Sequence, residues 1–140
     1  MSKVVSTRLQ DETFQRLSRV ARILDKTPSD TVATLVEESL REMEFALIEF
    51  RSSALGRQAF MNGSSLAVWE VIEIAQSHDM DQEKVADYFE RPSEWVKAAC
   101  NYAEAYPEEI DFAIKDSQAI ALTDLKRLLP NLKVFSVSDE

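Results

Sequence analysis

The sequence predicts a mainly helical protein with a small amount of β-structure. Only two glycines and four prolines occur among 140 residues, which indicates few tight turns. Hydrophobic residues make up 45% of the chain, enough to build a real core. Short alternating segments near the start and in the middle are interspersed with longer segments whose apolar residues recur at helical spacing. We expect two small domains over residues 1–46 and 47–116, followed by a tail over 117–140.

Charge is distributed unevenly along the chain, although the formal total is −9. The segment up to Lys26 carries six basic and three acidic residues, whereas the chain from Gln58 onward carries seven basic and sixteen acidic residues. A surface that faces phosphates is therefore expected near the N-terminus. The acidic remainder should repel DNA and suit a protein partner.

The segment KVVSTRL over residues 3–9 is predicted to be a β-strand, because it is rich in β-branched residues and alternates. One face carries Val5, Thr7 and Leu9, and the other carries Val4, Ser6 and Arg8. No second strand follows within hairpin distance, and an isolated strand leaves its backbone groups unpaired. A symmetric dimer in which each copy supplies one strand of an antiparallel ribbon solves this. Pairing of the strand with the second domain is the alternative.

Two helices follow the strand. The first begins at about Asp11, and its apolar stripe consists of Phe14, Leu17, Ala21 and Leu24. Arg16, Arg19 and Arg22 lie off that stripe, either as a solvated face or as phosphate contacts.

The second helix has a clear start signal, with Thr27 as N-cap, Pro28 at the first helical position and Asp30 in the first turn. Its apolar residues are expected to face inward, and its acidic residues Glu37, Glu38 and Glu42 outward. The inward set is Val32, Leu35, Val36, Leu40 and Met43.

The order of these elements resembles the ribbon-helix-helix family of Arc/MetJ-like repressors and antitoxins. A strand, a helix, a capped turn and a second helix follow one another within about 45 residues. The resemblance implies that a two-stranded ribbon enters the DNA major groove and that Val4, Ser6 and Arg8 read base edges. The fork of an arginine can meet guanine O6 and N7 independently of this resemblance.

The resemblance also implies that the start of the second helix anchors a phosphate. The positions concerned are Thr27 and Ser29, where the helix dipole favours an anion. The chain departs from the family in the turn between the helices, where a glycine is common and this sequence has Asp25 and Lys26.

The middle of the chain predicts a β-hairpin followed by short helices, in a winged-helix-like or helix-turn-helix-like domain. Strands are expected over residues 48–51 and 57–61, a turn at Asn62-Gly63, and a short third strand over 66–68. Helices are expected over residues 69–76, 81–89, 93–105 and 107–115.

Two sequence blocks here, GRQAFMNGSSLAVWEVIEIA and YAEAYPEEID, resemble a small domain family of antitoxin character. The resemblance covers residues 49–116 and implies association with a PIN-like toxin. Because this domain is acidic, we interpret it as a dimerisation or partner-binding module rather than a second DNA reader.

The tail over residues 117–140 predicts a helical face of Leu122, Leu125 and Leu129, a stop at Pro130, and a short strand over 134–137. It either packs back on its own domain or stays exposed. In the second case Leu122, Leu125, Leu129 and Phe135 are the expected partner-binding residues.

Nothing in the sequence points to catalysis, and we expect no enzyme activity, cofactor or metal. His78 is the only histidine and Cys100 the only cysteine, and no HExxH, GxSxG, phosphate-binding loop or CxxC motif occurs. The polar start is unlike a signal peptide, and no apolar run reaches the roughly 20 residues that span a bilayer. We therefore expect a cytoplasmic protein with no membrane segment.

Two functions fit these features. The first is a DNA-binding antitoxin that neutralises a PIN-like toxin and represses its own operon. The alternative is a stand-alone ribbon-helix-helix regulator whose second domain senses or assembles.

Overall fold

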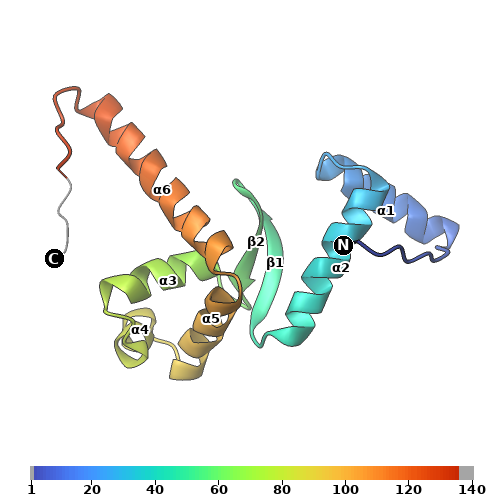
Figure 1. Ribbon diagram of the computed structural model, residues 1–140, viewed down its shortest axis with the longest axis horizontal. Helices are drawn as coiled ribbons and strands as arrows, with labels where there is room; N and C mark the ends of the chain where they lie inside the picture. Colours follow the sequence, from blue (N-terminus) through green and yellow to red (C-terminus); the bar gives the residue numbers. More distant parts are fainter. Residues whose placement is uncertain (1, 136–140) are drawn as a thin grey trace. The chain divides into compact units, whose positions relative to one another are not determined.

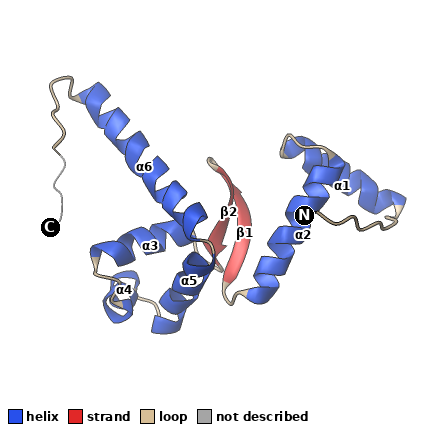
Figure 2. Ribbon diagram, in the orientation of Figure 1, coloured by secondary structure: helices blue, strands red, loops and turns tan. Residues whose placement is uncertain are grey.

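A computed structural model describes residues 2–135 and shows a mainly helical chain with one small antiparallel sheet (Figures 1 and 2), as predicted. The elements in chain order are α1 (Asp11–Ile23), α2 (Pro28–Glu44), β1 (Ile48–Ser53), β2 (Gly56–Met61), α3 (Val68–Ser77), α4 (Gln82–Phe89), α5 (Ser93–Ala105) and α6 (Pro107–Leu128). The chain divides into two compact units, unit 1 (Met1–Glu44) and unit 2 (Phe45–Glu140).

Unit 1 consists of α1 and α2, preceded by residues 2–10, which form no regular secondary structure. The strand predicted over residues 3–9 is absent from the single chain, which offers this segment no neighbouring strand to pair with. The turn after α1 places Asp25 in the left-handed region, at φ 54°. This backbone conformation favours glycine and tolerates aspartate, which accounts for Asp25 in a turn where the resembling family commonly has glycine.

Unit 1 has almost no interior of its own. Among its described residues only Ala21, Thr31 and Glu38 are buried. The prediction that Glu38 faces outward is therefore wrong. Val36 and Leu40, predicted to face inward, are 52% and 48% exposed, because the unit has no third element to cover that side of α2.

Unit 2 begins with a β-hairpin whose strands β1 and β2 confirm the two predicted over residues 48–51 and 57–61. The register pairs Ile48 with Met61 at one end and Ser53 with Gly56 at the turn. Gly56 has φ 98°, a conformation that L-residues rarely adopt.

The third strand predicted over residues 66–68 is wrong. Ala67 makes only a single bridge to Phe60, and Val68 already begins α3. The Glu70 side chain accepts a hydrogen bond from the Ala67 N–H at 3.1 Å. This satisfies one of the amides at the helix start, so the chain turns into a helix directly after the bridge.

The helices of unit 2 pack with the hairpin around one core. Helix α5 has the predicted bounds, and Asp81 caps α4 by accepting from the backbone N–H groups of Glu83 and Lys84 at 3.1 and 3.2 Å. The largest fully buried side chains of the unit are Tyr102, Met61, Val68, Val71, Val85 and Val96.

Helix α6 is longer than predicted. It continues from Pro107 to Leu128 in one piece, so the expected end near Lys115 is wrong. No glycine or proline interrupts residues 108–129, and the helix ends just before Pro130. Figure 1 shows the C-terminal part of α6 projecting beyond the other helices of unit 2.

Within residues 2–135, no helix is both long and apolar enough to cross a membrane. The same part of the chain holds no group of three or more His, Cys, Asp or Glu side chains arranged to bind a metal ion.

Candidate functional site

The proposed base-reading residues lie on the extended segment that precedes α1. Val4, Ser6 and Arg8 are all exposed, with Val4 at 93%. Within the described residues, neither the Ser6 hydroxyl nor the Arg8 guanidinium has a hydrogen bond or an ion pair. Their polar groups are therefore available to an external ligand.

The proposed phosphate-anchoring residues lie at the start of α2, and Thr27 caps this helix as predicted. Its hydroxyl oxygen accepts from the Asp30 N–H at 3.1 Å, and its carbonyl accepts from the Thr31 hydroxyl at 2.8 Å. Pro28 has no N–H, and the Ser29 N–H has no acceptor among the described residues. The first turn of α2 thus presents one unused amide together with the positive end of the helix dipole.

Basic side chains on α1 add positive charge to unit 1. Arg16, Arg19 and Arg22 are all exposed, and none of them has an ion pair with another described residue. Lys26 donates instead to the Thr34 hydroxyl at 2.9 Å, which ties the turn to α2.

An open apolar groove runs along unit 1 between residues 3–9, α1 and α2. Its apolar lining includes Val5, Leu9, Phe14, Leu17, Val20, Val32, Leu35, Val36 and Leu40. Phe14, Val36 and Leu40 are about half exposed, and Val5 is 89% exposed. Leu17 and Leu35 are half-buried between the helices, and no other described residue of unit 1 covers the rest of this face.

The proposed partner-binding residues lie on the projecting end of α6 and just beyond it. Leu125 and Leu129 are 47% and 53% exposed, Phe135 is 82% exposed, and Leu122 is half-buried. Val134 and Phe135 belong to no strand, and the rest of the strand predicted over 134–137 lies outside the described residues.

His78 and Cys100 pack against neighbouring residues of unit 2 and do not form an open site. His78 ends α3, where its ring Nδ1 lies 2.9 Å from the Ile74 carbonyl and its ring packs edge-on against Tyr88. Cys100 packs against the core, and burial raises the pKa of its thiol. A raised pKa keeps the thiol protonated and weakly nucleophilic at neutral pH.

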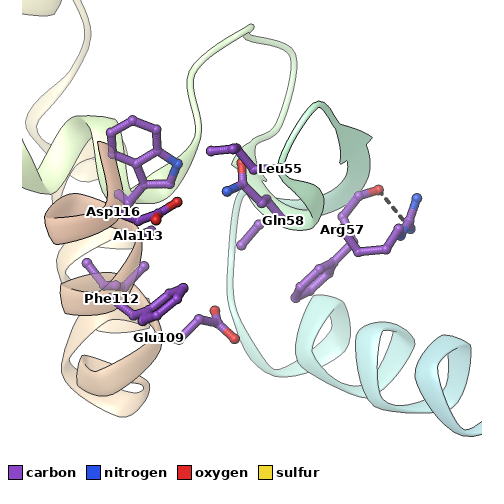
Figure 3. Close-up of a pocket in the computed structure, with 11 residues that line it drawn as sticks. Leu55, Arg57, Gln58, Glu109, Phe112, Ala113 and Asp116 are labelled. Atoms are coloured by element: carbon purple, nitrogen blue, oxygen red, sulfur yellow. Dashed lines mark hydrogen bonds between the residues drawn. The ribbon is translucent and has the colours of Figure 1, made fainter. Parts of the chain in front are cut away.

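Unit 2 also has a pocket that the sequence did not predict. It lies between the hairpin and α6 (Figure 3), and α6 contributes Glu109, Phe112, Ala113 and Asp116. Their spacing of three and four residues indicates one helix face, but the pocket depends on the hairpin that lies opposite.

No protein-family model, curated protein or solved structure matches the chain.

Proposed function

We propose that the chain is a dimeric, DNA-binding antitoxin of the ribbon-helix-helix type, without enzyme activity, that neutralises a basic PIN-like toxin and represses its own operon. One observation carries this proposal. Unit 1 leaves an apolar face open along α1 and α2, next to an extended segment with no strand partner.

A second copy of the chain would both cover the open apolar face and supply a strand partner for the extended segment. Unit 1 ends at Glu44, close to the length of about 40 residues below which a domain usually needs disulfides, metals or oligomerisation to be stable. Covering the exposed half of Val36 or Leu40 would contribute about 1 kcal/mol per side chain. Pairing residues 3–9 of the two copies would also satisfy backbone groups that one chain leaves to water.

Such a ribbon would present Val4, Ser6 and Arg8 on its outer face, in the form that fits a major groove. The Arg8 guanidinium and the Ser6 hydroxyl have no partner within the described chain. The Ser29 amide and the Thr27 region would hold a phosphate beside the groove. Base contacts would then give specificity, and phosphate contacts would give position.

The negative charge of unit 2 favours binding to a protein partner rather than to DNA. It carries nine basic and seventeen acidic residues, a formal charge of −8. A PIN-like toxin acts on nucleic acid, so a basic active surface is expected, which such an acidic unit would complement. Leu122, Leu125, Leu129 and Phe135, on the end of α6 and just beyond it, would supply apolar anchors. The proposal includes a winged-helix-like or helix-turn-helix-like arrangement for the rest of unit 2.

Two variants of the N-terminal segment test dimerisation and DNA binding. Thr7→Pro removes one ribbon hydrogen-bond donor and should prevent unit 1 from assembling. Arg8→Ala should keep the dimer but reduce preference for the operator over random DNA, by roughly 1–3 kcal/mol for each guanine contact. A wild-type chain that sediments as a folded monomer at micromolar concentration would contradict the dimer.

Truncation tests whether the tail over residues 117–140 binds the toxin. Removing residues 117–140 keeps Ile110 and Ile114, the two α6 residues buried in unit 2. The shortened chain should fold and bind operator DNA, but should no longer protect cells that express the neighbouring toxin. Full protection by the shortened chain would contradict the proposed role of the tail in toxin binding, whereas the absence of any toxic neighbour would favour the stand-alone regulator.

A further inference from the structure

A row of arginines on α1 has no counter-charge within the helix. Arg16, Arg19 and Arg22 follow one another at intervals of three residues, which places them along one side of α1. All three are exposed, and none has an ion pair or a hydrogen bond with a described residue. No acidic residue occurs between Thr13 and Leu24. This side of α1 therefore carries positive charge alone.

The spacing of the row makes it unfavourable in the isolated chain. Side chains three and four residues apart are neighbours on a helix, and like charges at such positions destabilise it. Arg19 has Arg16 and Arg22 at the two positions three residues away. The positions four residues away are Gln15 and Ile23, neither of which carries a charge. A polyanion outside the chain would remove this repulsion.

The row starts next to a residue proposed to anchor a phosphate. The turn between the helices brings the end of α1 to the start of α2 (Figure 1), where Arg22 and Thr27 line the same open hollow. The hollow is also lined by Lys26 and by two carboxylates, Asp25 and Asp30, so its own formal charges balance. Beyond Arg22 the excess positive charge continues along α1, away from this hollow.

Duplex DNA matches both the sign and the length of the row. A helix rises about 1.5 Å per residue, so the row is about 9 Å long. Duplex DNA carries one phosphate charge per roughly 1.7 Å of its axis, which gives about five charges over this length. Each of the three guanidinium groups can therefore meet a different phosphate, and the arginine fork donates two parallel N–H groups to phosphate oxygens.

An anionic lipid surface fits less well, although α1 is amphipathic. A helix that lies on a membrane buries its apolar face among the lipid headgroups. Part of the apolar face of α1 is already packed within unit 1, since Ala21 is 1% exposed and Leu17 is half-buried. The side that carries the arginines is thus left for a ligand that is recognised by charge.

We propose that Arg16, Arg19 and Arg22 hold the DNA backbone outside the bases that the ribbon reads, an inference that rests on the proposed DNA-binding function. The phosphate at the start of α2 fixes one end of this contact, and the row extends it along the flanking DNA. Because phosphate contacts carry no sequence information, these arginines add affinity and orientation without adding specificity. In a dimer the contact occurs twice, once for each copy.

The salt dependence of DNA binding tests this assignment. The full-length protein is titrated into a labelled, mixed-sequence DNA duplex several helical turns long, at about 50 to 200 mM sodium chloride. The test variant combines Arg19→Gln with Arg22→Gln, because Arg16 also borders the apolar groove. It removes four contacts from a dimer, so the slope of log K against log salt should become shallower by about 3.6, and affinity should fall at least about tenfold. The matched control, Lys126→Gln with Arg127→Gln, removes the same charge from exposed positions of α6 and should keep the wild-type slope.

The control measurements exclude a structural role for the two arginines. Circular dichroism and sedimentation of the test variant should match wild type, because glutamine is a good helix former and neither position lines the apolar groove. A variant that no longer forms the wild-type dimer would mean that Arg19 and Arg22 stabilise the dimer, and the assignment would be wrong. On the promoter DNA of its own operon, the test variant should keep the wild-type preference over mixed-sequence DNA, unlike Arg8→Ala. Loss of that preference would also contradict the assignment.

The remaining outcomes separate the arginine row from the rest of the function. A slope within about 1 of the wild-type value overturns the assignment and leaves DNA binding itself intact. The assignment also fails if the test variant loses binding to phosphatidylglycerol vesicles but not to DNA. If the wild-type protein binds no duplex even at about 50 mM salt, the DNA-binding function fails, and the inference that rests on it fails too.

Discussion

Tyr102→Phe should destabilise unit 2 by a small, measurable amount. The Tyr102 ring is fully buried and packs on Phe45, Phe50 and Tyr106, at centroid distances of 5.4, 6.3 and 5.0 Å. Phenylalanine keeps all of this packing and removes only the hydroxyl that donates to Glu109 at 2.6 Å. Hydrogen bonds to charged groups contribute about 1.5–3 kcal/mol. Because Glu109 is exposed and gains water in exchange, we expect a loss of about 1 kcal/mol.

Tryptophan fluorescence measures this loss in unit 2 alone, because both tryptophans, Trp69 and Trp95, lie there. A loss of 1 kcal/mol should lower the Tm by about 4–8 °C for a domain of this size. Tyr88→Phe is the matched control, since the exposed Tyr88 hydroxyl has no hydrogen bond with a described residue. Equal unfolding curves for the two variants would refute the contribution of the Tyr102 bond. A loss above about 3 kcal/mol would mean that the ring had lost its packing.

Three further predictions concern α4 and the core beside it. Asp81→Ala removes the cap that accepts from Glu83 and Lys84, and should cost about 1 kcal/mol in urea unfolding. Glu90→Gly should stabilise unit 2 by up to about 1 kcal/mol, because Glu90 ends α4 at φ 54°, and a lower urea midpoint would contradict this. Cys100 should react with a thiol reagent more slowly in the native than in the unfolded protein at pH 8. Because burial raises its pKa, its contribution to stability is complete below the unfolded pKa of about 8.5 and is lost as the pH rises toward the native value.

The sequence predicted those elements that local residues determine. The bounds of α5 were predicted correctly, and so was the start of α2, because the Thr27–Asp30 segment is a strong local signal. The third strand over residues 66–68 was predicted wrongly, since the start of α3 at Val68 depends on the Glu70 side chain reaching back to the Ala67 amide.

The candidate sites were less accessible to sequence reasoning. The orientation of Glu38 was wrong because the apolar period of α2 does not say which face has a neighbour in one chain. The pocket was missed because Asp116 and Phe112 line it only where the hairpin lies opposite α6, a long-range arrangement with no local signal.

The projecting end of α6 bears on how long the intact protein survives in the presence of proteases. From residue 118 to 133 every side chain except Leu122 and Leu132 is exposed, and this segment contains Lys126, Arg127 and Lys133. An isolated helix of this length is marginal and opens often, so a trypsin-like protease should cleave here first. The product would keep unit 1 and the core of unit 2 but lose Phe135. Cleavage would therefore end neutralisation before it ended repression, which separates the lifetimes of the two proposed activities.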